Sequence, residues 1–300
     1  MPFNFRILAL GFLFSSLWAS AFTVGRFAIQ SAPPLVFLSI RFALAFVVIA
    51  IMLKIMARQF PKDPRDRWTA IWLGLLNNAA YLGLGFIAFK TVTAGMVALV
   101  ASLMPIVTVA LAWPVLGERI TWKKALGTAL GFSGTFIILS GRLTGPIVVD
   151  DPFGLFLAAI GMICLAIGTV LYKKRGAHAD ALGMNGVQAG TAAIALLPVA
   201  LLMENPGDVV LDFNFAWTLA YAGIVMTVGA FWLWFLLIRA AGAGAASAFH
   251  FLSPGLALLF AWLLLDEPVS VRDILGLVPV AIGILLVNWP AKPAQTPVGA

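Results

Sequence analysis

Long apolar stretches alternate with short polar connections along the whole of this 300-residue chain. Each stretch has about 18 or more residues and few charges, which is enough for a helix to cross about 30 Å of hydrocarbon. The connections hold the Pro, Gly, Asp and Asn residues that favour turns, as in 31–34 and 203–214. The pattern predicts ten membrane-spanning helices, at about 7–29, 35–57, 68–89, 93–115, 122–141, 152–173, 182–203, 215–238, 242–264 and 271–289.

Composition agrees with a membrane protein, because 62% of the residues are hydrophobic and only 10% are charged. A soluble domain carries about 25% charged residues, so this chain could not cover its surface for water. The net charge of +7 comes from short basic clusters between apolar stretches. Such clusters are typical of loops that set membrane topology rather than of a nucleic-acid-binding face. The single cysteine, Cys164, cannot form an internal disulfide.

The two ends of the chain are read separately. Residues 6–21 resemble a signal peptide, but the apolar stretch continues to Ile29, so we expect a retained first helix. Residues 291–300 are polar and contain proline, and they are expected to form a disordered cytoplasmic tail.

An internal repeat relates the two halves of the chain. Residues 68–141 align without gaps to 217–290, and the offset stays at 149, since 217 − 68 and 283 − 134 are equal. We therefore predict a first five-helix repeat in 1–144 and a second in 145–290. The matched pairs include Trp68 and Trp217, Gly95 and Gly244, Pro105 and Pro254, Trp113 and Trp262, Glu118 and Glu267, and Gly127 and Gly276.

Charge indicates that the two repeats are inverted in the membrane. Five helices are an odd number, so the second repeat must enter from the opposite side. The loop 117–124 carries three basic residues and one acid, whereas its counterpart 266–273 carries one basic residue and three acids. We expect an all-α integral membrane protein of two inverted repeats with both termini cytoplasmic, although Lys90 and Arg142 do not fit this topology. Inverted repeats are typical of secondary transporters, whose site lies near the membrane midplane.

Two segments carry a family resemblance. The stretch LGERITWKKALGTALGFSGTFIILSG (116–141) resembles the end of an EamA repeat, and LDEPVSVRDILGLVPVAIGILLVNW (265–289) is its second copy. Two such units in ten spans resemble the drug/metabolite transporter superfamily, and the whole chain is similar to YddG-type amino-acid exporters of the bacterial inner membrane. The resemblance implies export of aromatic and other neutral amino acids. It also implies a central cavity formed by the third, fourth, eighth and ninth helices with parts of the first and sixth.

Polar side chains inside membrane helices usually face other helices or a wet cavity, because contact with lipid is costly. The third span carries Asn77, Asn78 and Tyr81, and the ninth carries His250 and Ser253. These residues are predicted to line a substrate cavity. Hydrogen bonding between helices is the alternative for the amides, and a buried structural role is the alternative for the histidine.

Aromatic residues deep in the spans extend this prediction. Trp18, Phe22 and Trp234 lie far from the span ends and are predicted to form an aromatic wall of the cavity, with lipid contact as the alternative. Tryptophans nearer the ends are typical of the aromatic belt at the membrane interfaces.

Matched prolines and glycines predict where the helices bend. Pro105 and Pro254 each leave a carbonyl four residues earlier without its donor, which predicts a pair of kinks around the midplane. Gly95 and Gly244 begin the same helices and are grouped with the prolines as gating positions. Arg41 lies within two turns of the outer end of its span, where we expect interfacial anchoring; pairing with a substrate carboxylate is the alternative.

The sequence predicts a secondary transporter rather than an enzyme. The spans contain no metal-ligand spacing, paired carboxylates or nucleophilic triad, so we expect neither a metal nor a cofactor. The predicted function is export of neutral, in particular aromatic, amino acids by alternating access across a bacterial cytoplasmic membrane. Alternatives are an exporter of other small metabolites or amphipathic drugs, a channel, and a membrane enzyme that uses His250 and Ser253. The expected partners are a small-molecule substrate and the lipid bilayer, with no nucleic acid, and the chain is expected to act as a monomer.

Overall fold

The computed structural model describes residues 5–88, 90–92, 94–140, 151–265 and 270–289, in which every regular element is a helix. The first half contains α1 (Phe5–Ala28), α2 (Pro34–Ile55), α3 (Pro64–Leu73), η1 (Gly74–Ala80), α4 (Tyr81–Ala88), α5 (Ala94–Ala101), α6 (Met104–Leu116) and α7 (Trp122–Ser140). The second half contains α8 (Pro152–Leu171), η2 (Tyr172–Gly176), α9 (Ala181–Met203), η3 (Pro206–Asp208), α10 (Phe213–Ala220), η4 (Tyr221–Ala230), α11 (Phe231–Ala241), α12 (Ala243–Ser247), η5 (Ala248–Phe251), α13 (Leu252–Leu265) and α14 (Val271–Val287).

These helices confirm the predicted all-helical membrane fold. The largest difference between a predicted span end and an observed helix end is four residues, at the start of α3, where 68 was expected and Pro64 is observed. Within the described residues, eight helical runs are long and apolar enough to cross a membrane. The two remaining helices, α7 and α14, have 19 and 17 residues and pack against each other.

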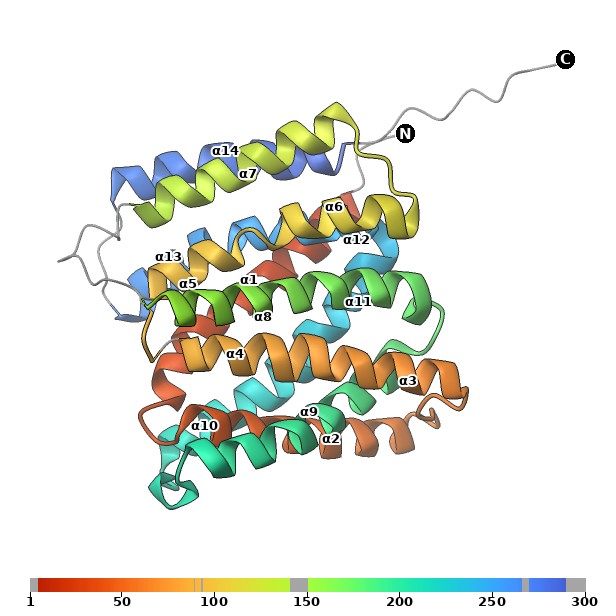
Figure 1. Cartoon of the computed structure of the whole chain (residues 1–300), viewed down its shortest axis with the longest axis vertical. Coiled ribbons are helices and arrows are strands. Elements are labelled where there is room, and N and C mark those ends of the chain that lie inside the picture. The colour runs from red at the N-terminus through yellow and green to blue at the C-terminus, as the bar shows by residue number, and fades with distance from the viewer. Residues whose placement is uncertain (1–4, 89, 93, 141–150, 266–269, 290–300) are drawn as a thin grey trace, which may run out of the picture.

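Glycines allow the close approach of α7 and α14, which run side by side along one edge of the bundle (Figure 1). A Cβ added at Gly127 would lie 2.5 Å from the carbonyl oxygen of Gly283, and one added at Gly134 would lie 2.5 Å from that of Gly276. Membrane helices have no hydrophobic force that drives them together, so they associate through such small-residue contacts.

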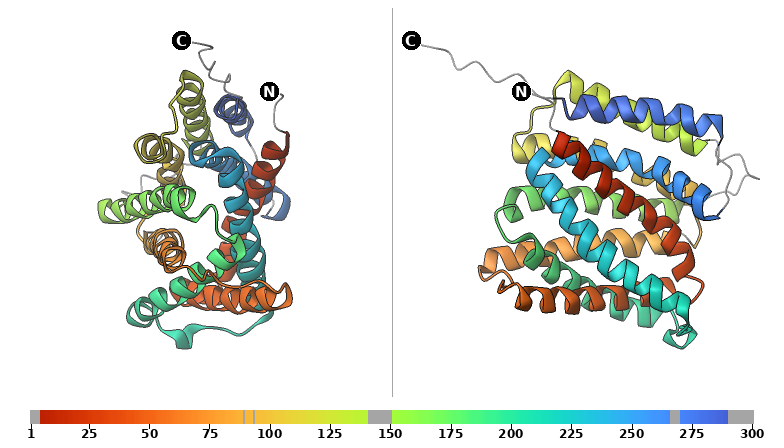
Figure 2. Two further views of the ribbon diagram at one scale, coloured as in Figure 1. Left: turned by 90° about the vertical axis from the view of Figure 1, so that its right-hand side faces the viewer. Right: turned by 180° about the vertical axis from the view of Figure 1, so that it is seen from behind.

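The two halves interlock through their first helices. The helix α1 packs against η4, α11 and α13 of the second half, and α8 packs against η1, α4 and α6 of the first (Figure 2). Two matched pairs, α2 with α9 and α7 with α14, lie against each other across the two halves. Residues from both repeats therefore meet in the middle of the bundle.

Matched positions in the two halves depart from regular α-helix. The π-helical segment η1 covers 74–80, and adding the offset of 149 places it at 223–229, inside η4. The helix pair α5 and α6 is interrupted just before Pro105, and α12 passes into the 3₁₀ segment η5 just before Pro254. Both prolines are the second or third residue of the helix that follows, where the missing N–H costs least. Regular α-helix is therefore interrupted next to both matched prolines.

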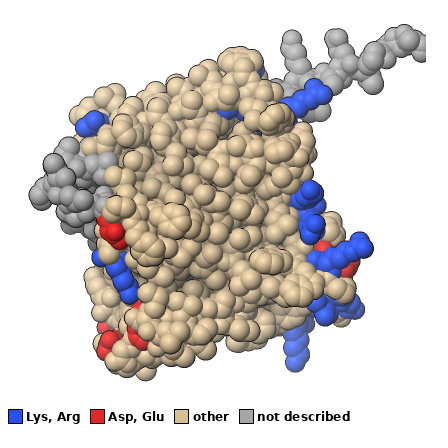
Figure 3. Space-filling view, viewed as in Figure 1, with Lys and Arg blue, Asp and Glu red and all other residues tan. Residues whose placement is uncertain are grey.

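One end of the bundle, called the basic end below, gathers most of the lysines and arginines (Figure 3). The basic residues of 54–67 lie there, from the last turn of α2 to the first turn of α3, and Lys173–Arg175 lie there in η2. The helix α1 begins and α14 ends at the same end, as an even number of crossings requires (Figure 1). At the opposite end, Nζ of Lys90 lies 3.6 Å from Oε1 of Glu204. This acid offsets the charge of Lys90, a residue that did not fit the topology predicted from the loop charges.

Candidate substrate site

Three of the predicted cavity residues form one aromatic stack in the middle of the bundle. The ring of His250, in η5, lies 4.8 Å from that of Trp234 in α11 and 5.3 Å from that of Trp18 in α1, with the planes within 20° of parallel. Phe14 extends the stack, with its ring 5.2 Å from His250 and 4.8 Å from Trp234. Separations of this size are favourable for aromatic rings.

Contacts between α1 and η5 hold the stack in place. The Ser15 hydroxyl lies 2.8 Å from the carbonyl oxygen of Phe249, next to His250, and is fully buried. Gly11 lies one turn earlier on α1, and a Cβ added there would lie 2.1 Å from the Phe249 ring. The Phe249 ring can occupy this place against α1 because Gly11 lacks a side chain.

Tyr81 connects the stack to the first half of the chain. It begins α4, and its ring lies 6.3 Å from that of Trp18, with an interplanar angle of 14°. Phe231 closes the other side of Trp18 at 5.7 Å, edge to face. Trp18 therefore lies between residues of α4 and α11, which belong to different repeats.

Several buried polar atoms in this region have no hydrogen-bond partner. They include both ring nitrogens of His250, Nε1 of Trp234 and Oγ of Ser253. Leaving such groups unpaired costs about 1–3 kcal/mol each. Unpaired atoms beside an aromatic stack are suited to a ligand that brings its own hydrogen-bonding groups, and they carry no fixed charge.

Asn77 and Asn78 are fully buried in η1, and neither amide makes a hydrogen bond. Asn77 faces α8, because a Cβ added at Gly168 would lie 1.8 Å from its Oδ1. The predicted alternative, hydrogen bonding between helices, is therefore not formed in this conformation. Both amides keep their capacity to bind a ligand.

The other predicted site positions have different outcomes. Pro105 and Pro254 lie at the helix interruptions. Gly244 is the second residue of α12 and is buried. Gly95 lies in α5, but its surroundings are outside the described part of the structure, as is the side chain of Phe22.

Ser253 and His250 do not form a nucleophile pair. A serine nucleophile needs a base within hydrogen-bond reach, yet the Ser253 hydroxyl and both His250 nitrogens lack any hydrogen-bond partner. In the described residues, no group of three or more His, Cys, Asp or Glu side chains is arranged to hold a metal ion.

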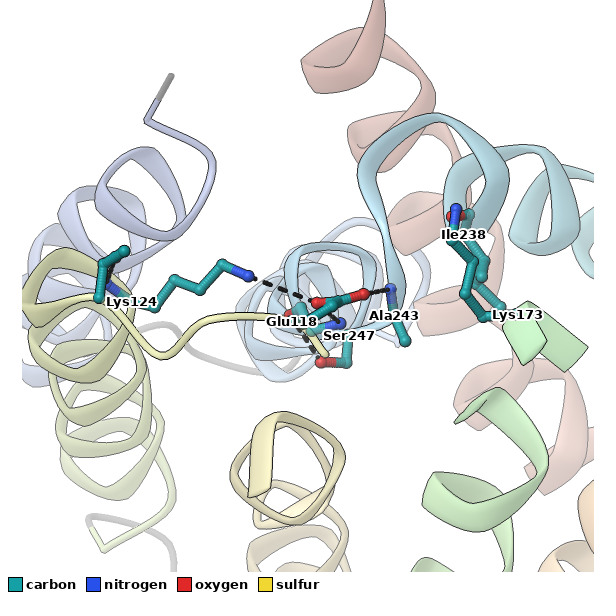
Figure 4. Close-up of polar contacts among 8 residues, drawn as sticks. Glu118, Lys124, Lys173, Ile238, Ala243 and Ser247 are labelled. Carbon is teal, nitrogen blue, oxygen red and sulfur yellow. Dashed lines mark hydrogen bonds and ion pairs between the residues drawn. The ribbon is translucent and has the colours of Figure 1, made fainter. Parts of the chain in front are cut away.

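Polar contacts at the basic end surround the turn between α11 and α12, and those of Glu118 join the two repeats (Figure 4). Glu118 follows α6, and its carboxylate accepts hydrogen bonds from the backbone N–H groups of Ala243 at 2.8 Å and Gly244 at 3.3 Å. Lys124 lies 3.3 Å from the same carboxylate. Lys173 donates to the carbonyl oxygens of Ile238 and Arg239 at the end of α11. The anionic Glu118 therefore lies at the start of α12, and the cationic Lys173 lies at the end of α11. Both placements are favoured by the helix dipoles.

Arg41 corrects one sequence prediction. We expected it to reach the membrane interface, but its side chain is 8% exposed and lies on the buried face of α2. Its Nε donates to Oγ1 of Thr227 in η4 at 2.9 Å. The position of Arg41 in its span suggested that the side chain would extend to the interface. Its partner, Thr227, lies beside it only because α2 packs against η4.

Comparison with known proteins decides the family. The model of the EamA-like transporter family matches the chain twice, over residues 5–140 and 152–289. The chain belongs to the EamA-like transporter family. It is thus related to membrane transporters, as the predicted repeat-end motif suggested.

Individual relatives are distant but cover most of the chain. The uncharacterized transporter YvbV of Bacillus subtilis is 25% identical over 297 residues, which is 97% of this chain and 94% of that protein. Protein PecM of Dickeya dadantii is 30% identical over 223 residues, covering 74% and 73%. A probable amino-acid metabolite efflux pump of Escherichia coli is 25% identical over 287 residues, covering 92% and 93%.

A solved crystal structure shares the fold. It superposes with a TM-score of 0.80 at 20% sequence identity, covering 94% of this chain and 96% of the other. At this identity the likeness shows the architecture alone.

Proposed function

We propose that this transporter exports neutral amino acids, in particular aromatic ones, by alternating access around the aromatic stack. The observation that carries the proposal is the stack of Trp18, Trp234 and His250, bordered by unpaired polar atoms without fixed charge. An aromatic side chain can stack on these rings, and amide or imidazole groups can hydrogen-bond a net-neutral substrate. The relative described as an amino-acid metabolite efflux pump supports the same substrate class.

The orientation and location are part of the proposal. The basic end would face the cytoplasm under the positive-inside rule, which places both termini there. The chain would lie in a bacterial cytoplasmic membrane, in line with relatives described as inner membrane transporters. It would act as a monomer, with a small molecule and the surrounding lipid as its partners.

Transport into liposomes that contain only this protein tests the function. We expect saturable uptake of labelled phenylalanine that is reduced at least about 10-fold by Trp18→Ala, which removes the ring that joins the stack to Tyr81. Trp113→Ala is the matched control, because Trp113 is 62% exposed whereas the rings of the stack are buried, so transport should persist. Absence of uptake above empty liposomes for every amino acid tried would refute the proposal.

Export of other small metabolites or amphipathic drugs is the second candidate. The stack would accept any flat apolar molecule, so the rings alone do not select an amino acid. Competition in the same liposomes separates the two: an excess of unlabelled drug that abolishes uptake while neutral amino acids do not compete would favour this candidate.

A further inference from the structure

A buried cation lies apart from the aromatic stack and has no acidic partner. Arg41 makes one hydrogen bond, to the neutral hydroxyl of Thr227, and its Cζ lies 5.4 Å from the centroid of the Phe42 ring. In the part of the chain that the structure describes, no carboxylate lies within ion-pair distance of the guanidinium. A charge inside a membrane bundle is costly unless it is paired, so such a residue usually marks a ligand site.

Thr227 places the guanidinium. Its hydroxyl lies 3.0 Å from the carbonyl oxygen of Ala222, five residues earlier, as the π-helical backbone of η4 allows. The hydroxyl proton is therefore used, and the oxygen is free to accept from Arg41. The carbonyl oxygen of Thr227 accepts from Nδ2 of Asn185 in α9 at 2.7 Å. Three elements, α2, η4 and α9, thus meet at Thr227, which occupies the position of Asn78 in the first repeat (78 + 149 = 227).

Unpaired acceptors lie on α9, the helix that contacts Thr227 through Asn185. Asn185 and Gln188 are both fully buried, and their side-chain oxygens have no hydrogen-bond partner. The two residues are three apart on α9 and share a face. At Thr227, a cation with four free N–H groups therefore meets Asn185, whose amide oxygen is free, and the free amide oxygen of Gln188 belongs to the next turn of α9.

This arrangement matches one kind of chemical group. A carboxylate satisfies a guanidinium, and an ammonium satisfies amide oxygens, so a group that carries both would pair the donors and the acceptors together. Thr227 and Trp234 lie seven residues apart on one helical run, which corresponds to about 10 Å. A molecule with its charged end at Arg41 could therefore direct an apolar side chain towards the aromatic stack.

We propose that Arg41, Thr227, Asn185 and Gln188 form a subsite for the zwitterionic head group of an α-amino acid. The guanidinium binds the carboxylate, and the oxygens of Asn185 and Gln188 accept from the ammonium. This inference rests on the proposed function, because it assigns the head group of the proposed substrate to a particular set of residues.

Binding to the purified full-length protein, measured by calorimetry with three probes, tests the subsite. The probes are phenylalanine, its amide, which lacks the carboxylate, and 3-phenylpropionate, which lacks the ammonium. We expect the wild-type protein to bind phenylalanine about 10- to 100-fold more tightly than either analogue, as loss of one charge-assisted hydrogen-bonded contact implies.

Two variants should give opposite signatures. Arg41→Gln should bind phenylalanine and its amide with affinities within about 3-fold of each other, because the carboxylate partner is gone. Gln188→Leu should instead reduce the preference for phenylalanine over 3-phenylpropionate, because an ammonium partner is gone. Arg41→Lys keeps the charge and should retain part of the preference for the carboxylate.

Arg58→Gln is the control, since Arg58 is an exposed cation that pairs with Asp180 at the basic end. It should behave as the wild-type protein does. A folded Arg41→Gln protein with the full wild-type preference for phenylalanine over its amide, or a folded Gln188→Leu protein with the full preference over 3-phenylpropionate, would overturn the subsite and leave the proposed function standing. Wild-type protein that neither binds nor transports any amino acid would overturn both.

Discussion

Replacing Glu118 by glutamine should loosen the basic end of the transporter. The carboxylate accepts from two backbone N–H groups of α12 and lies 3.3 Å from Lys124, so it links the end of α6 to the start of α12. In Glu118→Gln the side chain keeps one acceptor oxygen, but its NH₂ group cannot accept the second N–H or pair with the lysine.

The size of the effect follows from these contacts. One hydrogen bond to a charged group contributes about 1.5–3 kcal/mol, and each 1.4 kcal/mol is a factor of ten in an equilibrium. The fraction of molecules open at the basic end should therefore rise about 10- to 100-fold.

Thiol labelling measures that fraction. Ala112 is fully buried where α6, α8 and α12 meet, so Ala112→Cys in a Cys164→Ser background provides a thiol that is shielded while α12 is docked. A membrane-impermeant reagent applied at the basic end should label Glu118→Gln protein about 10- to 100-fold faster than the parent. Lys124→Gln is the matched control, because it removes only the partly exposed ion pair, which contributes about 0–1 kcal/mol. Equal labelling rates in Glu118→Gln and Lys124→Gln would refute the assignment of Glu118 as the contact that holds this end closed.

Two further substitutions test the packing of the bundle. Gly283→Ala should lower the free energy of unfolding by about 1–3 kcal/mol, because the new Cβ would lie 2.4 Å from the Gly127 carbonyl oxygen; Gly25→Ala, where nothing lies within 4 Å, should cause no loss. Thermal unfolding in detergent compares the two, and equal midpoints would contradict the glycine contact. Ser15→Ala should cost about 0.5–1.5 kcal/mol, since it removes a buried hydrogen bond to the Phe249 carbonyl, which keeps the Leu252 N–H as a donor, whereas Ser16→Ala removes only an exposed bond within α1 and should change stability by about 0.5 kcal/mol or less. A Ser15→Ala protein as stable as Ser16→Ala would show that this bond does not hold η5 against α1.

The candidate site was predictable only in part. Trp18, Trp234 and His250 could be chosen because aromatic and polar residues deep in a span are conspicuous, and the structure brings these three together. Phe14 was missed, because one phenylalanine among 23 carries no distinguishing signal. Ser15 was missed as well, since a serine in an apolar span is common, and its carbonyl partner lies 234 residues away.

The sequence by itself determined the spans, the two repeats and the positions of the kinks. Hydropathy is a local property, and a repeat with a constant offset needs no contacts to be seen; the paired prolines 105 and 254 follow directly from that register. Tertiary structure decided which helix faces meet. Arg41 was expected at the interface and lies against Thr227, 186 residues away, and Glu118 caps a helix that begins 125 residues later. Which polar groups pair depends on how helices from both repeats are rotated and how closely they approach. The order of residues along one helix determines neither the rotation nor the distance.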